Sequence, residues 1–440
     1  MSPTFRALSN ANYRRYATGS VVSNVGTWMQ RVAQDWLVLL LTANSGIAIG
    51  ITTGLQFLPF LVLSPFAGLI ADRVPKRRLL QVTNVMMAVP ALLLGILAVS
   101  GFVEIWHVYV LALMLGIGAA FDAPARQSFV SEIVDADDLT NAVGLNSASF
   151  NAARIVGPAL AGLLIAVLGG GVTATGLVIL VNAFTYIAPI LMLQRLDTAA
   201  LDTPLPVGRG PGAIREGIRY VRGRPDIMLV MAVVFFTGTF GLNFQMTSAL
   251  MATTIFDKGP TEFGLLATFM AFGSLAGSLI AARRVRVRHR LILGAAVAFG
   301  LVEIAAAFSP TYAVYALITP LLGLTALTMI TAANAFVQLH TDAGMRGRVM
   351  ALYMMIFMGG TPLGSPFIGW IGETYGARAT LWFGGLMTIV GALVSAAVFL
   401  LFARRRSDVL TALERPSNVN PRVWVNQAVV HAQKLPEGSR

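Results

Sequence analysis

The stretch Gly68-Leu-Ile-Ala-Asp72-Arg73-Val-Pro75-Lys76-Arg77-Arg78 separates two long apolar runs, at 47–70 and 79–100. As a helix, each run is long enough to cross the ~30 Å of hydrocarbon in a bilayer. A connection this short between two spanning helices forces a hairpin, and its four basic residues are typical of a cytoplasmic loop. Gly68 and Asp72 lie one helical turn apart, so a site of close backbone approach and a carboxylate meet at the membrane boundary. The stretch therefore predicts a membrane hairpin with a latch at its cytoplasmic end.

The sequence excludes a soluble protein, a thiolate metal protein and a pump driven by ATP bound on this chain. With 56% hydrophobic and 12% charged residues, the chain could not cover a water-exposed surface. It has no cysteine, and its four histidines are scattered without the spacing of metal ligands. No lysine follows a glycine, so the sequence holds no phosphate-cradling loop. We therefore predict no metal and no cofactor.

The basic residues follow the topology of a membrane protein rather than a nucleic-acid-binding surface. The net charge is +12, but arginine and lysine gather in every second connection, with six in 195–226 and five in 283–290. The other connections between spans hold only Lys258 and Arg378. By the positive-inside rule, both termini of this multi-pass protein are expected in the cytoplasm, with the chain in the cell membrane. Twelve spans are predicted, at 17–41, 47–70, 79–100, 106–126, 142–167, 176–194, 227–253, 263–282, 291–308, 312–338, 349–371 and 380–403.

Three segments lie outside these spans. Residues 1–16 combine aromatic and basic side chains and predict a short amphipathic helix on the cytoplasmic interface. Residues 195–226 predict a cytoplasmic linker that ends in an amphipathic helix, and 404–440 predict a polar cytoplasmic tail of no assigned role. The two domains are then an N-terminal bundle at 17–194 and a C-terminal bundle at 227–403.

An internal repeat relates the two sets of six spans. A shift of 207 residues places Leu115-Gly116 on Leu322-Gly323, Gly157 on Gly364 and Gly162 on Gly369. Some charges are present in one half only, because the same shift places them on uncharged residues. These pairs are Asp122 with Met329, Arg126 with Ala333 and Arg154 with Thr361. Charges that the repeat does not require are candidates for function.

The hairpin resembles the loop 2–3 signature of the major facilitator superfamily. Four residues match the signature in order, namely Gly68, Asp72, Lys76 and Arg77, while Pro75 stands where the family usually has a second glycine. The wider likeness covers nearly the whole chain and is to the twelve-helix efflux branch, which includes the enterobactin exporter and macrolide-efflux proteins. It implies an all-α fold of twelve transmembrane helices in two six-helix bundles related by a pseudo-two-fold axis.

The resemblance also implies a cytoplasmic gate. Asp72 is expected to face the start of helix 11, near Val349, where unpaired N–H groups favour a carboxylate. Asp122 is expected as a second acid that holds the basic residues of the motif. Those basic residues are Arg73, Lys76 and Arg77. Such a contact exists only while the inner gate is closed, so it biases one of two states. The alternative is a topogenic loop in which Asp72 is incidental.

Arg31 and Asp35 are charges deep in the first span. Counted from about residue 17, they lie roughly 21 and 27 Å into the helix, and a spacing of four places them on one face. Gln34 extends the same polar stripe. Burial disfavours the charge of a carboxylate whereas a neighbouring arginine favours it, so Asp35 is the candidate proton carrier. The alternative is a static ion pair near the outer surface.

Arg154 lies near the middle of the fifth span, with no acid beside it in the sequence. It is expected either to share Asp35 or to meet a substrate anion; an arginine bonded to backbone carbonyls is the alternative. Two arginines with one acid favour an anionic or amphipathic substrate. The same span carries Ala153-x-x-x-Gly157-Pro158-x-x-Ala161-Gly162, which resembles the antiporter motif of the family with alanine for two glycines. Ordinary packing of small residues is the alternative.

Two positions stand apart from the family pattern. Ala112 stands where the family has an arginine in helix 4, so either a proton route through that arginine is absent or Arg154 or Arg31 replaces it. Glu303, half-way along the ninth span, is either a second coupling acid or a carboxylate paired with a neighbouring helix, and pairing is favoured. Asn243 and Gln245 either line the cavity or bond between helices.

The sequence therefore predicts a secondary transporter and not an enzyme. It is expected to export a small organic or amphipathic molecule, drug-like or siderophore-like, in exchange for protons by alternating access. A proton-coupled importer is the first alternative. An integral membrane enzyme or a lipid-handling scaffold is disfavoured, because the sequence lacks metal-ligand spacing and a Ser-His pair at a common depth. The expected partners are a small-molecule substrate and the bilayer, with no nucleic acid, and the chain is expected to work as a monomer.

Overall fold

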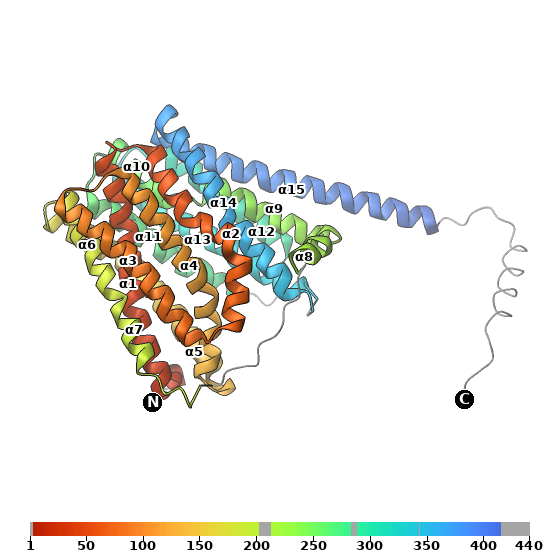
Figure 1. Ribbon diagram of the computed structural model, residues 1–440. Coiled ribbons are helices and arrows are strands. Elements are labelled where there is room, and N and C mark those ends of the chain that lie inside the picture. The colour runs from red at the N-terminus through yellow and green to blue at the C-terminus, as the bar shows by residue number, and fades with distance from the viewer. Residues whose placement is uncertain (1–2, 202–212, 283–287, 343, 415–440) are drawn as a thin grey trace, which may run out of the picture. The chain divides into compact units, whose positions relative to one another are not determined.

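The computed structural model describes residues 3–201, 213–282, 288–342 and 344–414, and every regular element within them is helical (Figure 1). The elements of the first half are η1 (Pro3–Ser9), α1 (Ala11–Leu41), α2 (Gly46–Arg73), α3 (Lys76–Ser100), α4 (Ile105–Ile133), α5 (Ala136–Val167), α6 (Val172–Thr185) and α7 (Ile187–Gln194). The elements after it are α8 (Ala213–Arg222), α9 (Pro225–Phe236), η2 (Thr237–Gly241), α10 (Phe244–Leu250), η3 (Met251–Ile255), α11 (Pro260–Ala282), α12 (His289–Ala307), α13 (Tyr312–His340), α14 (Arg346–Tyr375) and α15 (Ala377–Glu414).

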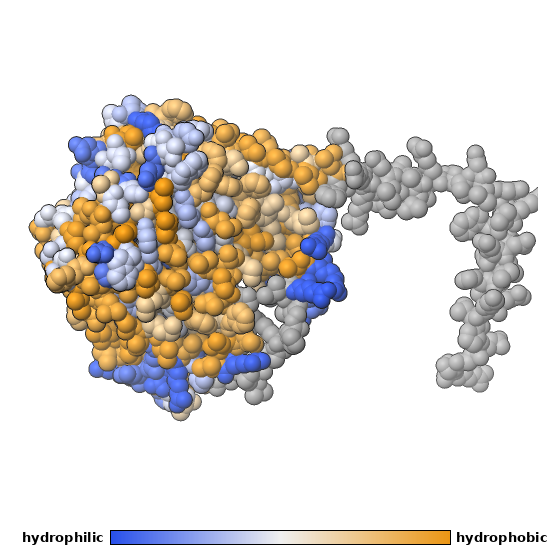
Figure 2. Space-filling model, turned by 45° about the horizontal axis from the view of Figure 1, so that its top comes forward, coloured by the Kyte–Doolittle hydropathy of each residue, from blue (hydrophilic) through white to orange (hydrophobic). Residues whose placement is uncertain are grey.

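Eleven segments of the described residues are long and apolar enough to cross a membrane. In this count α6 and α7 make one segment, and α9 to η3 make another. The helix α1 is 31 residues long but is not among the eleven, since Arg31, Asp35 and other polar residues lower its hydropathy. Figure 2 shows apolar side chains over a broad area of one face, with hydrophilic side chains gathered toward its ends. The chain is a multi-pass membrane protein with an all-α fold.

The helices of the two halves pack in equivalent pairs. Within the halves, α2 packs on α4 and α11 packs on α13; between them, α2 packs on α14 and α5 packs on α11. The 207-residue shift relates these pairs, as a pseudo-two-fold axis requires. Glycines allow the close approach between the halves, because a Cβ at Gly50 would overlap the backbone of Ser365 and one at Gly264 would overlap that of Pro158.

We call the end of the protein that holds the α2–α3 connection the basic end, and the end that holds the α1–α2 connection the opposite end. Gly50 lies near the start of α2 and Gly264 near the start of α11, so both close contacts lie toward the opposite end. The two halves are therefore packed directly against each other there.

The N-terminal segment differs from the predicted surface helix at 1–16. A short 3₁₀ helix, η1, precedes α1, which begins at Ala11 and runs without a break into the membrane span. Tyr13 is fully buried, and its hydroxyl donates to the Ala142 carbonyl at 2.7 Å. The backbone N–H of Ala7 donates to Asn141 at 2.9 Å. The segment therefore packs on α5, because its aromatic side chains find partners there.

The seventh span is interrupted, where the sequence predicted one uniform helix at 227–253. Two π-helical segments, η2 and η3, flank α10, with Leu242 N–H bonded to the Thr237 carbonyl at 2.9 Å in the first. Of the predicted linker, α8 is seen as a helix, while 202–212 lie outside the described residues. The predicted tail begins inside α15, which is helical to Glu414, and residues 415–440 lie outside the description. Contacts group residues 1–395 into one unit, which contains the whole site.

Candidate functional site

A cavity of about 170 Å³ lies between the two halves. Helices α1 and α5 form one wall, and α10, α11 and Leu242 form the other. The charged and polar side chains in this wall are Arg31, Arg154, Gln245 and Ser248, among apolar residues that include Trp28 and Phe263. The structure thus brings together two of the predicted coupling residues, Arg31 and Arg154, in one cavity.

Arg31 lies against aromatic rings rather than against an acid. Its guanidinium carbon is 4.7 Å from the ring centroid of Trp28 and 5.6 Å from that of Phe57. Among the ion pairs of the described residues, none joins Arg31 to Asp35. Arg31 and Asp35 therefore form no direct ion pair in this conformation. A desolvated cation over a Trp face gains roughly 2 kcal/mol, which offsets part of the cost of burying it.

Asp35 is buried, with 5% of its surface exposed, next to the other half of the protein. The Gln245 side chain of α10 lies beside its carboxylate. This contact joins α1 to α10 across the two halves. Because a single carboxylate at this interface gains or loses a charge with one proton, it can couple protonation to the fit between the halves.

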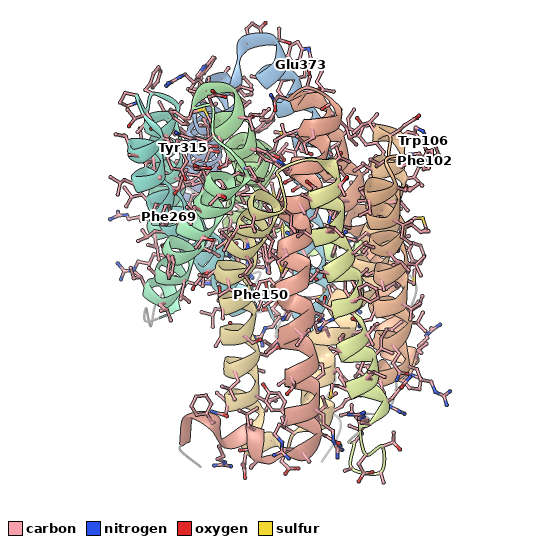
Figure 3. The ribbon with its side chains drawn as sticks, turned by 90° about the vertical axis from the view of Figure 1, so that its left-hand side faces the viewer. Phe102, Trp106, Phe150, Phe269, Tyr315 and Glu373 are labelled. Carbon is pink, nitrogen blue, oxygen red and sulfur yellow. The ribbon has the colours of Figure 1, made fainter. Side chains whose placement is uncertain are left out.

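Arg154 joins α5 to α11. Its guanidinium donates to the Ser274 hydroxyl at 2.6 Å, and its carbon lies 5.7 Å from the Trp28 ring centroid. The partner of Arg154 is therefore Ser274, and not Asp35 or a backbone carbonyl as the sequence had suggested. The sequence analysis did not identify Ser274. Two guanidinium groups therefore share one indole ring at the cavity wall. Phe150, labelled in Figure 3, packs edge-on against Trp28, with ring centroids 5.8 Å apart.

Amide side chains continue the polar stripe of α1 into the first half. Gln34 donates to Gln56 of α2 at 3.4 Å, and Asn182 of α6 donates to Gln30. These side chains line a small cavity of about 40 Å³, which Arg31 and Phe60 also border. The polar side chains of α1 therefore form hydrogen bonds to neighbouring helices and also border a cavity.

A larger cavity of about 770 Å³ lies toward the basic end. It separates α2 and α4 of the first half from α13 and α14 of the second. Phe60 borders this cavity and the small one, while Arg31 borders the small one and the 170 Å³ cavity. Four methionines provide an adaptable wall on α14, at Met350, Met354, Met355 and Met358. The three cavities follow one another from the basic end toward the paired arginines.

The basic hairpin is built as tightly as the sequence predicted. Only Val74 and Pro75 separate α2 from α3. Arg77 donates to the Leu193 carbonyl at 2.6 Å and thereby binds the last turn of α7, where cations are stabilised. Gly68 lines the large cavity, and Arg73 is exposed. The side chain of Asp72 lies outside the described residues, so the latch to α14 stays a prediction.

The expected role of Asp122 is wrong in this structure. Asp122 binds Arg126 of its own helix, at 2.7 and 3.2 Å, and accepts from Thr83 at 2.9 Å. Lys76 instead pairs with Glu132, and both side chains are buried. Glu132 follows the apolar part of α4 by two further turns, so it reaches the start of α3. In the sequence, Glu132 could have been noticed as an acidic residue beyond the predicted end of the fourth span, where the helix continues.

The antiporter-like motif packs α5 between α1 and α11. A Cβ at Gly157 would lie 2.6 Å from the Trp28 Cβ, and one at Gly162 would overlap the backbone of Pro260. Pro158 lines the 170 Å³ cavity. The small residues of the motif therefore hold Trp28, and with it both arginines, at the interface between the halves.

A second contact that the sequence did not reveal closes the opposite end. Glu373, in the last turn of α14, accepts from the Ser45 hydroxyl at 2.7 Å and from the Ile47 N–H at 3.3 Å. Ser45 is the N-cap of α2, so the carboxylate of one half binds the helix start of the other. Figure 3 shows Glu373 at the same end as Phe102 and Trp106.

Similar proteins share this architecture. The multidrug efflux pump Tap of Mycolicibacterium fortuitum is 28% identical over 372 residues, which cover 82% of this chain and 89% of that protein. The staphyloferrin A transporter of Staphylococcus aureus is 24% identical over 377 residues, covering 85% and 93%. Among solved structures, a D-xylose-proton symporter has a TM-score of 0.68 at 13% identity, covering 87% of this chain and 96% of that one. A bacterial homologue of Spinster, in an inward-facing and unoccupied conformation, has a TM-score of 0.63 at 16% identity, covering 88% and 97%.

The family described as "Transmembrane secretion effector" matches residues 2–427, which is nearly the whole chain. Together with two halves packed in equivalent pairs and cavities at their interface, this match confirms the predicted fold and excludes an enzyme family. The chain belongs to the transmembrane secretion effector family of the major facilitator superfamily.

Proposed function

We propose that this protein is a proton-coupled exporter that carries a small organic or amphipathic molecule out of the cytoplasm by alternating access. One observation supports this most: the cavities lead from the basic end to Arg31 and Arg154, while glycine contacts and Glu373 close the opposite end. The basic end is cytoplasmic in this proposal, as its arginines and lysines favour, so the conformation is inward-open. Both termini then lie in the cytoplasm.

The substrate is a molecule with an acidic group and an apolar or aromatic body. Two guanidinium groups at the cavity wall attract an anion, and Trp28, Phe57 and the methionines of α14 accept apolar surface. The printed functions of the relatives, multidrug efflux and staphyloferrin A transport, support the same range of compounds.

Proton exchange is assigned to Asp35. Its carboxylate is in contact with the other half through Gln245, and it is one helical turn from Arg31 on the same helix. In the proposed cycle, Asp35 takes up a proton while the site is open at the opposite end and releases it while the site is open at the basic end, where the substrate binds. The bundles at 17–194 and 227–403 move as rigid units within one monomer, and no cofactor takes part.

Transport into inverted membrane vesicles tests this function. An exporter loads such vesicles when their interior is made acidic, and the dissipation of the gradient by a protonophore stops the uptake. Candidate substrates come from a thermal-shift screen of siderophores, macrolides and other amphipathic acids on purified protein. A proton-coupled importer would instead lose substrate from loaded inverted vesicles under the same gradient, which would contradict the proposed direction.

A further inference from the structure

Glu303 is a buried carboxylate in the second half, away from the cavities between the halves. It lies near the end of α12 rather than half-way along it, and it is 2% exposed. Its Oε2 has no hydrogen-bond partner, so the expected pairing with a neighbouring helix is wrong. An unpaired carboxylate taken out of water costs several kcal/mol unless a cation or a proton balances it. The surroundings of this carboxylate show which of the two fits.

Two glycines allow close packing around Glu303, because a side chain at either position would overlap its neighbours. A Cβ at Gly241 would lie 2.6 Å from the Phe299 Cε1, 2.7 Å from the Thr388 Oγ1 and 3.2 Å from the Glu303 Oε2. A Cβ at Gly384 would lie 2.7 Å from the Phe240 carbonyl oxygen and 3.0 Å from the Glu303 Oε1. The Thr388 hydroxyl and the Phe240 carbonyl therefore lie near the two oxygens of Glu303, so that oxygens from η2, α12 and α15 gather around this carboxylate.

The converging groups have unused capacity to bind a cation. Thr388 is fully buried, and its hydroxyl has no partner. Asn243 donates to the carbonyls of Thr239 and Phe240, at 2.9 and 3.3 Å, while its own Oδ1 is buried without a donor. The π-helical turn of η2 directs the Phe240 carbonyl toward α15, away from the regular helix pattern. Irregular backbone of this kind is how transporter helices present carbonyl oxygens to sodium ions.

The charges around Glu303 favour a monovalent ion. Glu303 takes part in none of the ion pairs among the described residues. The described residues also contain no group of three or more Asp, Glu, His or Cys side chains that could hold a metal ion. The titratable neighbour on α13 is Tyr315, whose hydroxyl lies 3.3 Å from that of Ser248. One carboxylate among neutral oxygens balances a single positive charge. Mg²⁺ and Ca²⁺ require more oxygen ligands and usually more carboxylates.

We propose that η2, α12 and α15 form a sodium site, with Glu303, Thr388 and the Phe240 carbonyl as its ligands. A proton on Glu303 would neutralise the charge but would need only one acceptor, whereas oxygens of three elements gather around this carboxylate. The site lies wholly within the second half, so it depends on neither the proposed substrate nor the direction of transport.

Sodium binding to the purified full-length protein tests the proposal. Sodium chloride replaces choline chloride at constant ionic strength, and both the melting temperature and the binding of radiolabelled sodium are measured. We expect a saturable rise in Tm of roughly 2–4 °C in the unaltered protein, as a ligand specific to the folded state produces. Glu303→Gln and Thr388→Val should each lose the rise and the labelled sodium.

Matched variants separate the site from general effects on folding. Thr388→Ser keeps a hydroxyl and should keep the response to sodium. Thr380→Val, on the same helix, removes a fully buried hydroxyl that is already bonded to the Ala377 carbonyl, and should also keep the response. An equal response to sodium in Glu303→Gln would overturn the proposal. So would stabilisation by acid alone that Glu303→Gln removes, because that result assigns a proton to the carboxylate instead.

Discussion

Asp35 is the residue on which the proposed exchange depends most directly. Asp35→Asn keeps the shape of the side chain and can still hydrogen-bond to Gln245, but it cannot take up a proton. We expect uptake driven by a pH gradient to fall roughly tenfold or more, with substrate binding retained. Transport into inverted vesicles and thermal shift with substrate measure the two quantities separately.

The control for this variant is Asp257→Asn, which removes an exposed carboxylate in the connection after η3. Its transport should match that of the unaltered protein. If Asp35→Asn transported at a normal rate with its full dependence on the pH gradient, Asp35 would not be the proton carrier.

The Lys76–Glu132 pair gives a prediction on stability. Glu132→Gln leaves the charge of Lys76 buried without its counter-ion, which typically costs about 3–5 kcal/mol. We expect a lower melting temperature in detergent, and partial recovery in the Lys76→Met/Glu132→Gln double variant. Asp138→Asn breaks a more exposed pair with Arg6 and should cost roughly 0–1 kcal/mol. Equal melting temperatures for Glu132→Gln and Asp138→Asn would contradict this account.

At the scale of residues, the sequence predicted which charges are buried but not what they touch. Arg31 and Arg154 were expected in one cavity, and both line it. Trp28 lies one helical turn before Arg31 on α1 and could have been proposed as its neighbour. The bond from Arg154 to Ser274 depends on how α5 and α11 are rotated, which no local pattern specifies. The assignment of Asp122 to the basic hairpin failed for the same reason, since Glu132 reaches Lys76 only because α4 extends beyond the predicted span.

The pair α2 and α14 gives a prediction at the scale of elements. Glu373 of α14 binds the start of α2 at the opposite end, and Asp72 of α2 is expected to bind the start of α14 at the basic end. The two contacts would then stabilise opposite states. Glu373→Gln weakens a carboxylate at a helix N-terminus, an interaction of about 0.3–1 kcal/mol at exposed sites. We expect the population open at the opposite end to rise by a factor of roughly 2 to 5.

Distances between spin labels measure this change. Labels on Phe102→Cys and Tyr375→Cys lie in different halves near the opposite end, and the chain has no other cysteine. The control is Glu262→Gln, because Glu262 accepts from the Gly259 N–H within its own half. The idea fails if Glu373→Gln and Glu262→Gln leave the same distance distribution.

The limits of most spans were predicted within a few residues, because apolar runs bounded by charges and turns mark them. The interruption of the seventh span was not predicted. Gly238 and Gly241 were visible in the sequence, but the π-helical turn also needs contacts from other helices. Glu303 and Thr388 are more than sixty residues beyond this turn, so no sequence window joins them to it.

At the scale of the whole molecule, the repeat predicted two similar halves, and the helix pairs confirm it. Which end is closed could not be predicted, because both closures use the same helices, α2, α5, α11 and α14. The conformation depends on contacts spread along them, such as Ser365 with the Gly50 carbonyl at 2.9 Å and Thr268 with the Ile155 carbonyl at 2.9 Å. No local sequence pattern predicts the total energy of these contacts, so the sequence does not show which end is closed.

If the halves rock about the central cavities, the opposite end must open once in every cycle. Ser45→Cys and Glu373→Cys place two thiols where side chains now touch, so a short bifunctional thiol reagent can join them. We expect the cross-linked protein to keep less than about a tenth of its transport while it still binds substrate from the basic end, because only one of two states remains accessible. Reduction of a cleavable reagent should restore transport, and each single cysteine variant should be insensitive to the reagent. Unchanged transport with the cross-link in place would mean that substrate leaves without separation of α2 from α14, and alternating access between these halves would have to be abandoned.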